Sequence, residues 1–70
     1  MTVTETYLNN LYKLGMENPK LQSDFARKEA FFIAEAASNR HITSVIEIGA
    51  TNQWYLTKKG FKLLQKEGYL

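Results

Sequence analysis

Apolar residues in the front half of the chain recur at the three- and four-residue spacing of helices. A leucine series predicts a helix over residues 4–16. A longer helix is predicted over residues 24–38, with Ser23 as a candidate N-cap and Asn39 as a left-handed stop. More than half of its circumference is apolar, which is typical of a helix at the centre of a fold or at a subunit interface.

The hydrophobic pattern changes to a two-residue period after residue 41. Residues 42–48 are rich in β-branched side chains that alternate between two faces, as in a half-buried strand. Residues 49–53 interrupt this pattern with glycine and asparagine, which tolerate left-handed backbone, so the turn is predicted there. Residues 54–56 resume it. The prediction is a β-hairpin that packs on helices, because an isolated hairpin is marginally stable in water.

A last helix is predicted from Thr57, a good N-cap, to about Glu67. Gly60 costs this helix about 1 kcal/mol relative to alanine, and the close approach of another backbone would offset that cost. Gly68 occupies the position of a left-handed C-cap. The order helix, helix, strand, strand, helix predicts one small α+β domain over residues 1–70.

The apolar faces of these elements predict the hydrophobic core. We expect it to contain seven side chains: Leu11, Phe32, Ile33, Ile46, Leu56, Phe61 and Leu64.

The junction between the hairpin and the last helix resembles a known family. Residues 55–60 (YLTKKG), followed by Leu63 and Leu64, are similar to the segment where the wing ends and the last helix begins in many bacterial winged-helix regulators. This resemblance implies a winged-helix-like DNA-binding domain involved in transcription regulation. Three helices usually precede the wing in that family, whereas only two are predicted here unless residues 19–22 form a short one.

The resemblance also implies where DNA would be contacted. The helix before the hairpin would lie in the major groove, and the wing tip over residues 49–53 would touch the DNA backbone or the minor groove. Thr51 and Asn52 are the polar candidates at that tip. The candidate groove-facing residues are Gln22, Ser23, Arg27 and Lys28.

The basic residues point in the same direction. The net charge is only +2, but the segment from Arg40 to the C-terminus has five basic and two acidic residues. Its lysines recur every four residues on one helical face, which is typical either of a solvated face or of a phosphate-binding stripe. The candidate nucleic-acid-binding residues are Arg27, Lys28, Arg40, Asn52, Lys58 and Lys62.

Aromatic residues support a competing hypothesis. A small chain with an aromatic hairpin also suits a phage- or plasmid-encoded modulator that binds a host protein, because buried Trp and Tyr dominate many interfaces. The alternative role for the tryptophan is packing in the core or at its rim. A homodimer built on the long helix is compatible with either DNA binding or protein binding. The candidate anchors are Tyr12, Phe31, Trp54 and Tyr55.

Composition argues against enzymatic chemistry. The chain has no cysteine and a single histidine, so we expect no metal site and no cofactor. No glycine-rich phosphate loop or nucleophile–base pair is recognisable, so a non-enzymatic protein is predicted. No apolar run approaches the roughly 20 residues that cross a bilayer, and no signal peptide is recognisable, so a cytoplasmic protein without membrane contact is expected.

Overall fold

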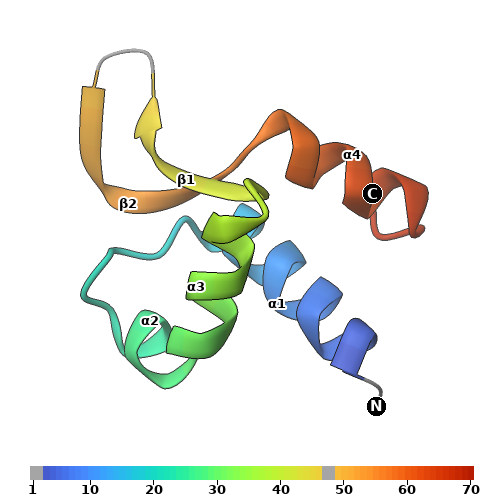
Figure 1. Cartoon of the computed structure of the whole chain (residues 1–70), viewed down its shortest axis with the longest axis horizontal. Helices are drawn as coiled ribbons and strands as arrows, with labels where there is room; N and C mark the ends of the chain where they lie inside the picture. The colour runs from blue at the N-terminus through green and yellow to red at the C-terminus, as the bar shows by residue number, and fades with distance from the viewer. Residues whose placement is uncertain (1–2, 47–48) are drawn as a thin grey trace.

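The computed structural model describes residues 3–46 and 49–70, and this part of the chain contains four helices and one two-stranded antiparallel sheet (Figure 1). In chain order the elements are α1 (Val3–Glu17), α2 (Asp24–Lys28), α3 (Ala30–Ser38), β1 (Ile42–Ile46), β2 (Gly49–Leu56) and α4 (Lys58–Lys66). The α+β class, the hairpin and the C-terminal helix predicted from the sequence are therefore confirmed.

The predicted long helix is divided at Glu29, whose φ of −107° and ψ of 37° depart from helical values. Three described helices therefore precede the hairpin. The division has a packing reason. Ala26 of α2 and Phe32 of α3 are both buried, yet in a continuous helix they would lie about 120° apart around the axis. Breaking the helix between them lets both face the core.

The hairpin turn is not where the sequence predicted it. β1 and β2 pair antiparallel, and Ile46 lies opposite Gly49. Residues 49–53, predicted as the turn, instead form the first part of β2. Residues 47–48, which the sequence assigned to the first strand, lie outside the described residues.

A second pairing segment within the chain explains why this part of β2 is extended. The loop between α1 and α2 runs along it, so that the backbone N–H of Leu21 donates to the carbonyl of Asn52 (2.9 Å). The N–H of Trp54 donates to the carbonyl of Pro19 at 2.8 Å. These bonds coincide with a register irregularity in β1 between residues 43 and 45. β2 thus pairs with β1 at both ends and with the loop in its middle.

The core lies where α1, α3, α4 and the start of the hairpin meet. Its buried side chains form one cluster: Leu8, Leu11, Leu14, Phe32, Ala36, Ile42 and Leu64. Of the seven predicted core residues, three are buried (Leu11, Phe32 and Leu64) and two are half-buried against the cluster (Ile33 and Leu56).

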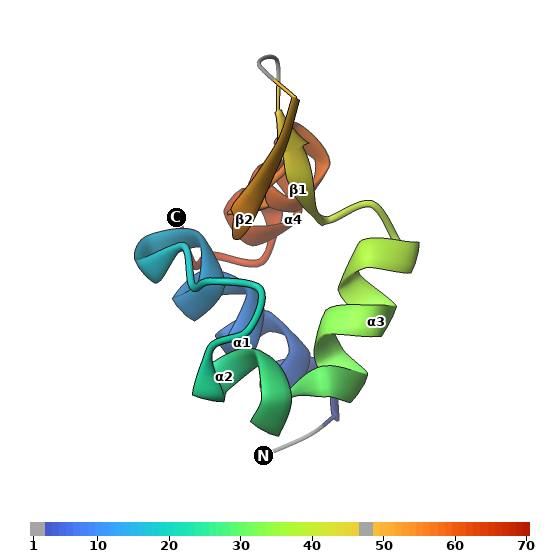
Figure 2. The same cartoon turned by 90° about the vertical axis from the view of Figure 1, so that its left-hand side faces the viewer.

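Two core predictions are wrong. Ile46 is 38% exposed because the hairpin projects away from the helices, as both views show (Figures 1 and 2). Phe61 is 45% exposed because α4 turns Gly60 and Leu64 inward. Residue 61 lies about 100° around the helix from residue 60, so its side chain points away from the core.

The start of α4 is held against the end of α3. The Thr57 side chain accepts from the N–H of Gly60 (3.0 Å), which confirms it as the N-cap. A Cβ on Gly60 would overlap the carbonyl oxygen of His41, so the predicted close approach of another backbone is also confirmed.

Both α3 and α4 end in left-handed residues. Gly68 has φ +84°, which confirms the left-handed C-cap predicted there, and its neighbour Tyr69 donates to the carbonyl of Leu64 (2.9 Å), as in a Schellman motif. At the end of α3 the left-handed residue is Arg40 (φ 62°), whereas Asn39 is right-handed, so the predicted stop is displaced by one residue.

Candidate nucleic-acid and protein interfaces

Four exposed basic residues lie near the point where hydrogen bonds join the end of α3 to the start of α4. The Thr57 hydroxyl donates to the carbonyl of Arg40 (2.6 Å), and the Thr57 N–H donates to the carbonyl of His41 (3.0 Å). These bonds place Arg40 beside Lys58 and Lys59 at the start of α4. We call this group the basic corner; it consists of Arg40, Lys58, Lys59 and Lys62.

The cations of the basic corner are available to a ligand. All four side chains are exposed, and none forms a hydrogen bond or ion pair with the described residues. Residues 40–66 contain five cations and one carboxylate, at Glu47, which lies outside the described residues. The remainder of the chain has four cations and six carboxylates. Charge is therefore segregated, because Arg40 and α4 supply the five cations of residues 40–66, whereas α1 and α3 are each net negative.

The other predicted nucleic-acid-binding residues form a separate group. Arg27 on α2 donates through its guanidinium to the carbonyl of Gln22 (2.8 Å), next to the loop that pairs with β2. Lys28 lies beside Asp24 and Glu29 in a shallow hollow. The nine residues of α3 separate this group from the basic corner, a rise of about 13 Å. The six predicted residues thus do not converge on one surface.

Two expectations about groove and tip contacts change as well. Asn52 is exposed but lies within β2, where its carbonyl bonds to Leu21, so its prediction as a wing-tip residue is wrong. The exposed side chains of α3 include Phe31, Ala34 and Glu35 but no cation. The predicted groove-facing residues therefore lie on α2 and the loop before it, and not on the helix that directly precedes the hairpin.

The four aromatic candidates differ in exposure. Phe31 is 94% exposed on α3. Tyr12 is partly exposed, and its ring centroid lies 6.2 Å from that of Tyr69. The Trp54 ring packs against the core, and the Tyr55 hydroxyl donates to the Gln53 side chain (3.2 Å). Phe31 is the one large aromatic candidate that presents nearly its whole ring to solvent.

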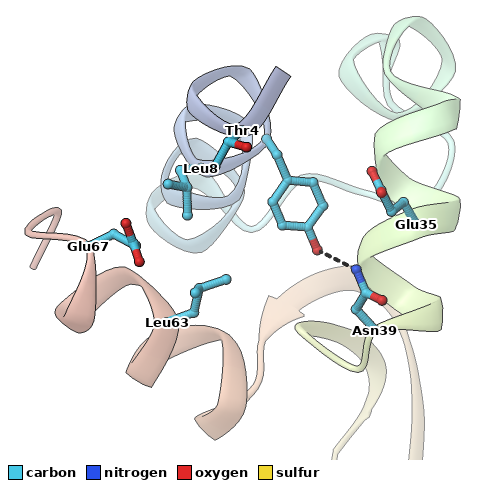
Figure 3. A pocket seen from close by; sticks show the side chains of 7 residues that line it. Thr4, Leu8, Glu35, Asn39, Leu63 and Glu67 are labelled. Carbon is cyan, nitrogen blue, oxygen red and sulfur yellow. Dashed lines mark hydrogen bonds between the residues drawn. The ribbon is translucent and has the colours of Figure 1, made fainter. Parts of the chain in front are cut away.

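Acidic side chains border a groove between α1, α3 and α4, next to the basic corner. Two open hollows adjoin one another, one of about 260 Å³ between α1, α3 and α4 and one of about 370 Å³ between α1 and α3. Tyr7 and Glu35 line both. Figure 3 shows the first hollow, with Glu35 and Glu67 on its two sides. Glu29 lines the second hollow beside Phe31. We call the two hollows together the acidic groove.

A hydrogen-bonded network links the groove to the basic corner. The Tyr7 hydroxyl accepts from the Asn39 amide (3.3 Å) and shares a hydrogen bond with Nδ1 of His41 (2.6 Å), in which the tautomer of His41 sets the donor. Burial raises the pKa of Tyr7, and the Glu35 carboxylate adds to this while the Asn39 bond opposes it. Burial also lowers the pKa of His41, with a smaller contribution from the Lys59 ammonium.

Sequence reasoning missed Lys59, Tyr7 and the glutamates of the groove. Gly60 could have indicated Lys59. A glycine that allows the close approach of another backbone segment also brings its neighbouring residues near that segment. Nothing in the sequence indicates that Glu35 and Glu67 share a hollow, because they lie on separate elements.

Residues 3–46 and 49–70 contain no cluster of His, Asp or Glu side chains that could hold a metal ion. No helix in the same ranges has the length and apolar character needed to span a bilayer. No protein-family model, curated protein or solved structure matches the chain.

Proposed function

We propose that this chain is a small DNA-binding protein of winged-helix type that holds duplex DNA through the basic corner. The observation that carries the proposal is that four exposed cations, none paired with a described residue, lie at the junction of α3 and α4. Lys and Arg side chains of this kind neutralise phosphates and release counterions, which drives sequence-independent affinity.

The element order supports the same proposal. Three described helices precede a projecting hairpin, and a single bridge joins Lys20 of the preceding loop to Gln53 of β2. The resemblance at residues 55–64 implies this arrangement. The side chains favour contact through Arg40 and α4, because the exposed face of α3 has no cation to accompany a helix into the major groove.

The chemistry expected at this surface is phosphate contact. Each cation that neutralises a phosphate contributes about 0.9 to the slope of log affinity against log salt. Such contacts position a protein on the duplex and do not read its sequence. A DNA-binding protein without cysteine is also consistent with a reducing cytoplasm.

A fluorescence anisotropy titration with mixed-sequence duplex at several salt concentrations tests the proposal. We expect wild-type binding to weaken steeply with salt, and Lys58→Ala or Lys62→Ala each to reduce the salt slope by about 1. Lys28→Ala is the matched control, because it removes the same charge from an exposed position on α2. Absence of binding below about 100 μM in low salt would overturn the proposal.

One observation favours a protein-binding function as the second candidate, namely the exposure of Phe31. Exposed aromatic rings are frequent interface anchors. A pull-down in which Phe31→Ala loses a captured protein and Tyr12→Ala retains it would support this function. Capture that is indifferent to Phe31 would count against it.

A further inference from the structure

The outward surface of α3 is apolar and has no covering element among the described residues. Phe31 is 94% exposed, and Ala30 and Ala34 beside it are exposed too. The inward residues Phe32 and Ala36 are also apolar, so α3 is hydrophobic around nearly its whole circumference. A helix of this kind is normally buried on both sides.

The acidic groove beside this surface restricts what can cover it. Three glutamates line its two hollows, at positions 29, 35 and 67, and no Lys or Arg lines either of them. The hollows are open and each is near or below the lower end of the volume range for small-molecule pockets. They therefore suit individual side chains of a macromolecule, and the glutamates favour one that is cationic.

A symmetric contact between two copies of this face does not satisfy these charges. A two-fold axis places the same patch on both subunits, so Glu29 and Glu35 of one copy would face those of the other. Like charges across an interface disfavour association.

The chain itself presents a complementary surface on α4. Phe61 is 45% exposed, and Lys58 and Lys62 lie three residues before it and one residue after it. Lys66 continues the same basic stripe. An exposed apolar ring beside a basic stripe is the counterpart of an apolar face beside carboxylates.

We propose that a second copy of this chain docks head-to-tail, with Phe61 and the lysines of its α4 against Phe31 and the acidic groove of the first. This contact joins two different surfaces, so the docked pair retains one free α4 on the first copy and one free groove on the second. Such heterologous contacts add further copies in an open chain. The proposal goes beyond DNA binding and does not depend on it.

Sedimentation velocity of the full chain over a range of concentrations tests the contact. We expect the average mass to rise from the 8.1 kDa monomer past that of a dimer as concentration increases. Raising the salt from about 50 mM to about 500 mM should weaken the association, because exposed charges are screened. A monomer at every concentration, or a mass that stops at the dimer, would overturn the proposal.

Two phenylalanine variants separate the surfaces. Phe31→Ala damages the groove side and Phe61→Ala damages the α4 side, so each alone should weaken self-association about tenfold or more. Tyr12→Ala is the matched control, as a partly exposed aromatic outside both surfaces, and it should associate like wild type. Circular dichroism of each variant is the control for correct folding.

Mixing the two variants gives the most specific result. The intact α4 of the Phe31→Ala copy can dock on the intact groove of the Phe61→Ala copy, and neither remaining surface can extend the pair. The mixture should therefore form a dimer that does not grow. A mixture that stays monomeric while wild type assembles would contradict the head-to-tail contact.

Discussion

At the residue scale, Gly60 controls how closely α4 approaches the end of α3. Gly→Ala normally stabilises a helix by about 1 kcal/mol. Here the added Cβ would overlap the backbone carbonyl of His41, which cannot move aside like a flexible side chain. We expect Gly60→Ala to destabilise the fold by about 1–3 kcal/mol, measured by chemical denaturation.

Gly15→Ala is the comparison for this prediction. Its Cβ would meet the end of the Leu56 side chain at 3.1 Å, and that side chain can shift. We expect its effect to stay within about 1 kcal/mol of zero. Equal effects of the two substitutions would show that the His41 contact does not govern Gly60.

His41 gives stability a defined dependence on pH. Its folded-state pKa is lowered, mainly by burial and further by Lys59, so the unfolded chain binds a proton more readily. The contribution of His41 to the free energy of unfolding is therefore fully present above its unfolded-state pKa of about 6.5. It is lost as pH falls through the lower folded-state pKa. Protonation of His41 places a hydrogen on both ring nitrogens, so Nδ1 then donates in its hydrogen bond with the Tyr7 hydroxyl.

The measurement for this prediction is the melting temperature from pH 7.5 down to pH 5. Wild type should lose stability over that range, and His41→Gln should lose less of it because glutamine does not titrate. Identical pH profiles for the two proteins would remove His41 as the cause.

At the element scale, Thr57 joins α4 to the end of α3. Its hydroxyl caps Gly60 and donates to Arg40, while its N–H bonds to His41. Thr57→Ala removes the two side-chain bonds, and we expect a loss of about 1–2 kcal/mol in unfolding free energy. Thr57→Ser keeps the hydroxyl and should recover most of it. An alanine variant as stable as wild type would show that neither bond contributes.

Elements were predictable from the sequence where local signals agree. The cap at Thr57, the left-handed Gly68 and the alternating pattern of β1 all depend on neighbouring residues. The break at Glu29 was not predictable, because residues 24–38 contain no glycine or proline to indicate it. The turn was misplaced because residues 49–53 gain a partner from the distant loop before α2.

The same distinction applies to the candidate surfaces. The exposure of Lys58 and Lys62 follows from their helical spacing, so the sequence identifies them individually. Their proximity to Arg40 depends on hydrogen bonds between elements 17 residues apart. The acidic groove likewise combines α1, α3 and α4, which no local pattern can indicate.

At the scale of the whole molecule, two adjacent phenylalanines have opposite environments. Phe32 is 7% exposed in the core, whereas Phe31 is 94% exposed. Phe32→Ala should cost about 3–5 kcal/mol, which is a large part of the stability of a domain of this size. Phe31→Ala should leave the melting temperature of the monomer nearly unchanged. If the two variants melted alike, the orientation of α3 described above would be wrong.

The segregation of charge between the basic corner and the acidic groove is the central feature of the whole molecule. Under the DNA-binding function proposed above, we expect DNA to contact Arg40 and α4, away from Arg27 and Lys28. The most direct measurement is an NMR titration of the isotopically labelled chain with mixed-sequence duplex DNA, following each backbone amide. We predict that the largest shifts occur at residues 40–41 and 57–62. Shifts confined to residues 20–28, shifts confined to the acidic groove, or no shifts at all would contradict the account.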